Sequence, residues 1–315
     1  MTEVLSALPV VVILGAVAFD VVLGEPPSRL HPVVWMGALI GALRRRAPAT
    51  GAARQLVWGA AVALGVPALF AAGTVGLQVL TDDPWWLTAV VGVLVLKPCF
   101  AIRALRDAGR TVARALARGD LAAARHDLRA LCSRDASALS AEEVAAGAVE
   151  SLAENTSDSV VAPLLYFALF GVPGAVAYRA INTLDAMLGY RGDLEYLGKA
   201  AARLDDVANL IPARVTAALL LVAGALDGAN LHGGLRILAR DGGRTASPNA
   251  GRPMAAMAGL LGVALVKPGH YRLGDDDRPL SHRTIDRAWR LCAIAIALTV
   301  VLAAGLAVLL RGGAP

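Results

Sequence analysis

Cysteine is scarce in this 315-residue chain, and the familiar nucleotide-binding motifs are absent from it. Its three cysteines, Cys99, Cys132 and Cys292, lie far apart without a C-x-x-C pair, so neither a disulfide framework nor a zinc site is expected. The sequence also lacks a G-x-x-x-x-G-K-[ST] loop, a G-x-G-x-x-G fingerprint and a G-x-S-x-G elbow. Any ATP that the protein uses must therefore be bound by a route other than the P-loop.

Charge is sparse as well. Only 17% of the residues are charged and 57% are hydrophobic, with a mean hydropathy of +0.59, which is too apolar for an ordinary soluble domain. Apolar runs recur along the chain, and the longest reach the roughly 20 residues that cross a bilayer. They occupy residues 10–23, 56–80, 84–96, 160–180, 215–226 and 291–310. We expect an all-α, polytopic integral membrane protein.

The first apolar run has no basic segment before it and no small-residue cleavage site after it, so we expect a retained helix. The net charge of +5 could suggest nucleic acid, but the arginines sit in the loops between apolar runs. The positive-inside rule explains this pattern, so no nucleic-acid partner is expected and these loops should face the cytoplasm. The chain shows no internal repeat. We expect one integral membrane domain over 1–315, with a polar helical insertion at about 103–154 on the cytoplasmic side.

A capping-box pattern at Ser140 and Glu143 predicts the start of a helix that continues towards Glu154. Along it, residues 143, 147, 150, 154 and 158 fall on one stripe. A solvated face explains Glu143, and it is an open alternative for Glu150. It explains Glu154 and Asp158 less well, because they enter the next apolar segment.

That apolar segment, 160–180, is broken by Gly171-Val-Pro173-Gly174 into two pieces too short to span a bilayer. A re-entrant hairpin would bring the polar residues at its two ends to the same membrane side. A single kinked span is the alternative, and it would place them on opposite faces. Ionisable groups beside a membrane segment are costly and usually mark function. The polar residues at the ends are Glu154, Asn155, Thr156 and Asp158, then Arg179, Asn182, Asp185 and Arg191.

Three sets of side chains can carry chemistry. Carboxylates and amides suit magnesium, and the candidate ligands are Asp158, Asp185, Asp205, Asp206 and Asn209. Arginines and a Gly-rich turn before a helix suit phosphate, and these candidates are Arg179, Arg191, Arg214, Arg244, Ser247, Asn249 and Arg252. His31, which follows a double proline, is a candidate ligand or acid/base group, although a His-Pro step of this kind is often only a rigid turn and His31 alone is not favoured as a catalyst.

These segments together resemble the CobD/CbiB family, the adenosylcobinamide-phosphate synthases of cobalamin biosynthesis. The resemblance covers almost the whole chain in order. Its motifs are Asp20-x-x-Leu-Gly-Glu-Pro with His31-Pro-Val, Glu150-Ser-Leu-Ala-Glu-Asn-Thr-Ser-Asp158, Asn182-Thr-Leu-Asp-Ala-Met-Leu-Gly-Tyr190, Asp205-Asp-Val-Ala-Asn-Leu-Ile-Pro-Ala-Arg214, and Ser247-Pro-Asn-Ala-Gly251 with Tyr271. Glu25 and the 266–269 segment depart slightly from the family pattern, which affects only those two loops.

The resemblance implies a multi-pass protein of the cytoplasmic membrane, in contact with membrane lipid, whose active site faces the cytoplasm. It implies an ATP- and Mg²⁺-dependent ligase that joins adenosylcobyric acid, a corrinoid, to (R)-1-aminopropan-2-ol or its O-phosphate. Other enzymes of cobalamin assembly are the partners it suggests. Glu154, Asp158 and Asp185 are then the catalytic candidates. Asn155, Thr156, Asn182 and His31 join the arginines, Ser247 and Asn249 in binding substrate and phosphate.

Two other classes of protein can place polar clusters beside apolar helices. A magnesium-dependent intramembrane prenyl- or phospho-transferase would tend to repeat an Asn-Asp-x-x-Asp string, and the chain has none. A transporter-like binding protein would use the broken helix as its site, and it would be expected to show repeat symmetry. Both remain alternatives to the ligase.

Overall fold

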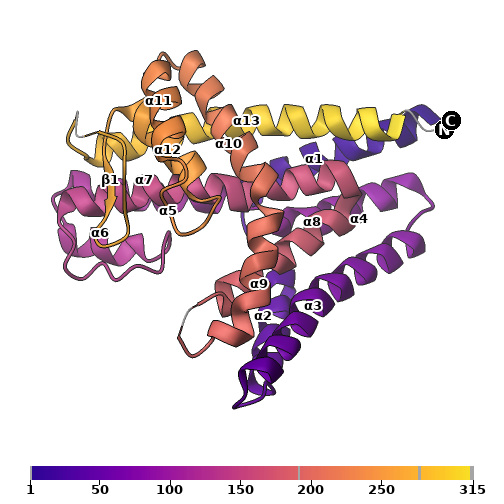
Figure 1. Ribbon diagram of the computed structural model, residues 1–315. Coiled ribbons are helices and arrows are strands. Elements are labelled where there is room, and N and C mark those ends of the chain that lie inside the picture. The colour runs from indigo at the N-terminus through magenta and orange to yellow at the C-terminus, as the bar shows by residue number, and fades with distance from the viewer. Residues whose placement is uncertain (1, 191, 276–277, 313–315) are drawn as a thin grey trace. The chain divides into compact units, whose positions relative to one another are not determined.

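The computed structural model describes residues 2–190, 192–275 and 278–312 (Figure 1). Its order is α1 (Thr2–Leu23), η1 (Ser28–Leu30), α2 (Pro32–Arg45), α3 (Ala52–Leu80), α4 (Trp85–Leu96), η2 (Lys97–Cys99), α5 (Ile102–Ala117), α6 (Leu121–Leu128), α7 (Ala141–Thr156), η3 (Ser157–Val161), α8 (Ala162–Leu188), α9 (Glu195–Ala208), α10 (Leu210–Leu226), α11 (Leu231–Asp241), α12 (Gly251–Leu261), β1 (Leu265–Lys267), β2 (Tyr271–Leu273) and α13 (His282–Gly312). The expected all-α fold is confirmed.

Four helical segments are long and apolar enough to cross a membrane, or five if the bent α9–α10 pair is one span. The four are Ala52–Leu80, Trp85–Ala117, Ala141–Leu188 and His282–Leu310. This length and composition confirm a multi-pass membrane protein with broken helices. The described strands are a single antiparallel pair, in which Leu265 lies opposite Leu273.

The chain forms two compact units. Unit 1 comprises residues 1–101, 162–209 and 300–315, and unit 2 comprises residues 102–161 and 210–299. The polar region expected at 103–154 thus belongs to a larger unit that also contains α10, α11 and α12. The organisation as one membrane domain with an insertion stays a prediction.

In unit 1, α3 packs against both α8 and α9, and α2 packs against α8. Gly59 permits the closest of these approaches, because a Cβ atom at this position would lie only 2.1 Å from the carbonyl oxygen of Leu197 in α9. A side chain at Gly59 would therefore force the two helices apart.

Helix α8 reverses direction at Gly171, whose φ of 71° and ψ of −164° are non-helical (Figure 1). This conformation is accessible essentially only to glycine. The rings of Tyr166 and Tyr178, on either side of the reversal, stack with centroids 5.0 Å apart. Twelve residues of straight helix would separate them by about 18 Å. The segment therefore folds back as a helical hairpin rather than running on as one kinked helix, and its re-entrant placement in a membrane stays a prediction.

The core of unit 2 is built around α7 and α12. Ser140 and Glu143 form the expected capping box, so α7 begins at Ala141, and it runs two residues beyond Glu154 to Thr156. Every residue of α12 except Arg252 is buried, as is nearly all of α7 after Glu143. Apolar side chains of α5, α6, α10, α13 and the strand pair complete this core.

Candidate active site

In unit 1 the structure gathers the predicted acids and amides of α8 and α9. Asn209 caps the C-terminus of α9, and its Nδ2 donates to Oδ2 of Asp205 over 3.0 Å. The buried Tyr178 hydroxyl donates to Oδ1 of the same amide over 2.8 Å. Asp185 and Asp206 are close enough to act electrostatically on Asp205. Three predicted carboxylates therefore form one cluster, and Tyr178 orients its amide.

One carboxylate oxygen of Asp205 has no hydrogen-bond partner. Its Oδ1 is buried and completes no hydrogen bond, although the Asn182 amide approaches the carboxylate. Within the described ranges, no three His, Cys, Asp or Glu side chains are arranged to enclose a metal ion. Magnesium, however, is usually held by one or two carboxylates together with substrate phosphates and water. Asp185 and Asp205 fit that partial ligand set, and the described residues do not form an all-protein cage.

Arg179 lies on the same arm of the hairpin, one turn before Asn182. Its Nη1 donates to Oδ1 of Asn182 over 3.4 Å, while its Nε is buried without a hydrogen-bond partner. A partly buried guanidinium with an unused donor can bind an oxyanion at little rearrangement cost. Arg179 therefore remains the strongest phosphate-binding candidate of unit 1.

Unit 2 holds the second set of predicted acids. Asp158 lies in η3, a π-helical turn of a kind that is rare and frequent at functional sites. Glu150 is 2% exposed and forms an ion pair with Arg134, so a solvated face is wrong for this residue. Tyr271 of β2 lies near Glu150 and Glu154, and burial, reinforced by the charge of Glu150, raises the pKa of Tyr271.

The predicted phosphate-binding loop, residues 244–251 of unit 2, is ordered by hydrogen bonds of its own hydroxyl groups. Thr245 Oγ1 donates to the Ser247 carbonyl over 2.7 Å and accepts from the Gly251 amide over 3.0 Å. The Asn249 amide donates to Ser247 Oγ over 3.3 Å. Arg214 Nη1 reaches Asn249 Oδ1 at 3.5 Å, and Arg252 keeps a buried Nε without a partner. Four of the predicted binding residues, Arg214, Ser247, Asn249 and Arg252, thus lie in or beside one loop.

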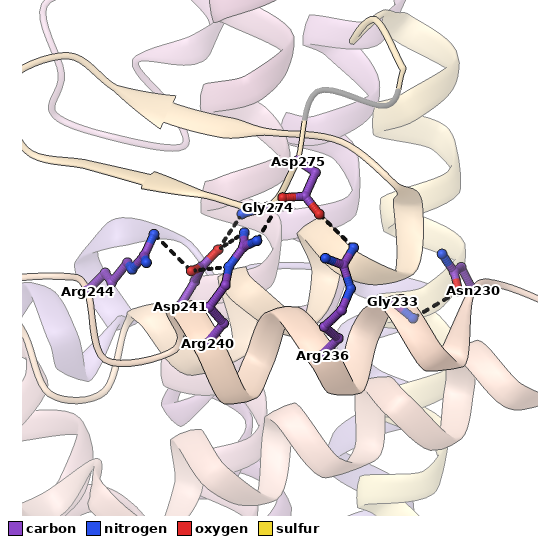
Figure 2. A network of polar contacts seen from close by, with 8 residues as sticks. All are labelled: Asn230, Gly233, Arg236, Arg240, Asp241, Arg244, Gly274 and Asp275. Atoms are coloured by element: carbon purple, nitrogen blue, oxygen red, sulfur yellow. Dashed lines mark hydrogen bonds and ion pairs between the residues drawn. The ribbon is translucent and has the colours of Figure 1, made fainter.

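Arg244, in contrast, belongs to a structural network at the end of α11 (Figure 2). Its Nη1 lies 3.0 Å from the buried carboxylate of Asp241, which also pairs with Arg240 and accepts from the Gly274 amide over 2.8 Å. Hydrogen bonds from Arg240 hold the pKa of Asp241 below its usual range. The network ties the strand pair to α11, and Arg244 takes part in it, while its phosphate-binding role stays a prediction.

His31 also uses both ring nitrogens within the protein. Nδ1 accepts from the Val33 amide at the start of α2, and Nε2 lies 3.0 Å from Glu25 Oε2. Glu25 in turn pairs with the buried Lys97 at 2.7 Å, and Lys97 pairs with the buried Asp20 at 3.0 Å. The geometry gives His31 a capping role in unit 1, and its contact with substrate stays a prediction.

Comparison with known proteins supports the resemblance seen in the sequence. A family model described as CobD/Cbib protein matches residues 13–301. The chain belongs to the CobD/CbiB family. It is 44% identical over 301 residues to the cobalamin biosynthesis protein CobD of Dehalococcoides mccartyi, covering 93% of this chain and 96% of that protein. It is 43% identical over 305 residues to the protein of the same name from Geobacter metallireducens, covering 93% and 95%.

An archaeal relative, the probable cobalamin biosynthesis protein CobD of Methanothermobacter thermautotrophicus, is 41% identical over 295 residues, covering 93% of this chain and 96% of that protein. No solved structure matches the chain. Membership of the CobD/CbiB family supports a role in cobalamin biosynthesis for this protein.

The two units of this CobD/CbiB chain divide the predicted site residues. Unit 1 holds Arg179, Asn182, Asp185, Asp205, Asp206, Asn209 and His31, and unit 2 holds Glu154, Asn155, Thr156, Asp158, Arg214, Ser247, Asn249 and Arg252. Arg191 lies outside the described residues. A single site shared by both groups stays a prediction. Asn155 and Thr156 donate to the Ser151 and Leu152 carbonyls of their own helix.

Three residues that pair with the predicted site residues or lie beside them could not be recognised in the sequence. Tyr178 looked like part of an apolar helix, and Arg134 like one of many loop arginines. Lys97 stood at the end of an apolar run without any pattern around it. The spacing of the acids predicted that Glu150 lies on a helix, but no sequence pattern indicated that Arg134 would be its ion-pair partner.

Proposed function

We propose that this protein is an ATP-dependent ligase of the cytoplasmic membrane, with its active site on the cytoplasmic side. It would join a propionate of adenosylcobyric acid to the amine of (R)-1-aminopropan-2-ol or its O-phosphate. Family membership over nearly the whole chain supports the pathway. The observation that carries the chemistry is the carboxylate cluster of Asp185, Asp205 and Asp206, with its buried, unpaired Asp205 oxygen.

A carboxylate is a poor electrophile, and an amine is protonated at neutral pH, so the two do not condense unaided. In the proposed reaction a propionate oxygen attacks the γ-phosphorus of ATP, the bond from that phosphorus to the β–γ bridging oxygen breaks, and ADP departs, which leaves an acyl phosphate. The amine nitrogen then attacks the acyl carbon, the carbon–oxygen bond to phosphate breaks, and inorganic phosphate leaves. A protein base accepts the proton from the amine.

The residues divide these tasks. Asp185 and Asp205 would hold magnesium, which supplies charge neutralisation for the phosphates when it is bound. Asn209 and Tyr178 keep the Asp205 carboxylate oriented. Arg179 offers its unused donor to the transferring phosphoryl group.

In unit 2, Glu154 and Asp158 are the candidates for the base, and the loop at Ser247 and Asn249 is the candidate cradle for a second anion. The hydrogen bonds from hydroxyl groups that already order this loop support the assignment, because a pre-formed anion site loses little conformational entropy on binding.

The test uses the purified protein in lipid nanodiscs with adenosylcobyric acid, aminopropanol phosphate, ATP and Mg²⁺, and it measures the amide product by mass spectrometry. Asp205→Asn and Asp185→Asn should each lower kcat by about 10²–10³-fold, the usual cost of removing one preorganised electrostatic group. Asp107→Asn, at an exposed acid of α5, is the matched control. Full activity of the Asp185→Asn/Asp205→Asn double variant, or no amide from the unmodified protein, would refute the proposal.

A further inference from the structure

Two apolar grooves lie along the α2–α3 hairpin of unit 1. One has a volume of about 310 Å³ and the other about 420 Å³, and they share Trp58 and Ala61. The first groove is lined by Leu39, Leu43, Trp58, Ala61, Val62, Gly65, Val66 and Leu69. Within it, Leu69 is 59% exposed, so this apolar surface is not covered by the rest of unit 1.

The length of the groove matches one leaflet of a bilayer. From Trp58 to Leu69 the helix rises about 16 Å. Half of the roughly 30 Å hydrocarbon core is about 15 Å, which is the depth that one acyl chain reaches. Helix α3 is itself one of the membrane-spanning candidates. A lipid chain lying along α3 would fill this groove from the interface to the bilayer midplane.

The second groove leads to a strongly basic turn. It is lined by Arg54 together with Trp58; nearby, Arg44 and Arg45 form part of the last turn of α2, and Arg46 is its C-cap. All four arginines are exposed. The sequence contains no Asp or Glu between Glu25 and Asp82, so no acid near them in sequence offsets their charge.

Trp58 marks the boundary between the apolar groove and the basic turn. Its Nε1 donates to the Leu43 carbonyl over 3.2 Å, which fixes the indole with its polar edge towards the end of α2. Gln55 ties the same turn by donating to the Pro48 carbonyl over 3.1 Å. Tryptophan in this position is typical of a membrane–water interface, where one edge of the ring is wet and the body is apolar.

We propose that the α2–α3 surface is a binding site for an anionic phospholipid of the bilayer. The phosphate lies against Arg45 and Arg54, and one acyl chain follows α3 past Trp58 to Leu69. Arginine suits this role because its guanidinium can bind a phosphate through two donors. None of the residues that line the two grooves belongs to α8 or α9, and the proposal does not depend on the amidation reaction.

The experiment measures quenching of tryptophan fluorescence by brominated lipids in the purified full-length protein. Phosphatidylglycerol and phosphatidylcholine with identical dibrominated chains are titrated in mixed micelles. Trp58→Phe identifies the signal of this tryptophan by difference. Arg45→Gln/Arg54→Gln removes the headgroup contacts. Arg118→Gln/Arg129→Gln, at the exposed arginine that follows α5 and at the exposed C-cap of α6, is the matched control.

We expect phosphatidylglycerol to quench Trp58 at lower concentration than phosphatidylcholine. The preference of the Arg45→Gln/Arg54→Gln variant should be about 30-fold weaker, since two arginines near an anionic surface contribute on the order of 1 kcal/mol each and about 1.4 kcal/mol corresponds to tenfold. Equal quenching by the two lipids would overturn the proposal, as would an equal loss in the control variant. Concentration-dependent dimerisation that protects Trp58 from both lipids would assign the surface to a second copy of the chain instead. Because the readout is binding, a failed amidation assay leaves this result unaffected.

Discussion

Alanine at two glycines of the same helix should have opposite effects on stability. Gly59 and Gly73 both lie inside α3. At Gly59 a Cβ would sit 2.1 Å from the Leu197 carbonyl oxygen, whereas ordinary contact begins near 3.4 Å. At Gly73 no atom lies within 4 Å of the position that an alanine methyl group would take. The same substitution therefore meets backbone atoms at one site and open space at the other.

The magnitudes follow from that difference. Gly59→Ala must move α9 away from α3 by about 1.3 Å, and overpacking of this kind costs about 1–3 kcal/mol. Gly73→Ala meets nothing and should stabilise the helix by about 0.5–1 kcal/mol, the propensity difference between the two residues. Since α9 carries Asp205 and Asp206, Gly59→Ala should also misplace them relative to Asp185. A misplacement of about 1 Å can cost about 10²-fold in rate.

The assay is reversible unfolding in mixed detergent micelles, followed by circular dichroism, together with the amidation rate of each variant. Gly73→Ala is the control for any general effect of alanine in α3. Equal stability of the two variants would refute the close approach of α3 to α9. A stable Gly59→Ala protein with a normal amidation rate would refute the idea that this contact positions the acids.

Three further predictions concern hydrogen bonds and charge. Tyr178→Phe should lower the free energy of unfolding by about 1–2 kcal/mol, because it leaves Asn209 Oδ1 buried without a donor. The same substitution should slow amidation. Tyr166→Phe is the control, because the Tyr166 hydroxyl donates to a backbone carbonyl. Asp205→Asn should raise the Mg²⁺ concentration needed for half-maximal rate, measured by titration, and an unchanged Mg²⁺ dependence would argue against its role as a ligand. The pKa of Asp241 is lowered by Arg240, so the stability that this carboxylate contributes is present above about pH 4, the ordinary carboxyl range, and is lost as the pH falls further. The hydrogen-exchange protection of the Gly274 amide should fall in that range, and Arg240→Gln should move the loss to higher pH; protection that is independent of pH would contradict the assignment.

Several features of the fold could be predicted because they depend on neighbouring residues in the sequence. The capping box at Ser140 places the start of α7, since both of its hydrogen bonds join residues three apart. The reversal at Gly171 follows from a glycine that can adopt positive φ and a proline that lacks a backbone donor. The four-residue spacing of Asp205 and Asn209 likewise produces the hydrogen bond between them on α9.

Other features could not be predicted, because they join residues far apart in the chain. Asn209 takes its second bond from Tyr178, 31 positions earlier, and Glu150 is neutralised by Arg134, which precedes α7. Arg244 lies only three residues from Asp241, but the sequence did not show that this acid would be buried by the packing of distant segments. No local pattern distinguishes an arginine that pairs with a buried acid from one that keeps a free donor.

The sequence by itself determined the membrane class, the helical composition, the broken segment at Gly171 and the family. Each of these depends on composition, on periodicity or on the order of short motifs, which are properties of neighbouring residues. Only the tertiary structure decided which distant polar side chains pair where they are buried: Asn209 with Tyr178, Glu150 with Arg134, and Lys97 with Asp20. Burial and pairing arise when distant helices pack, and the cost of leaving a buried polar group unpaired then selects the partners.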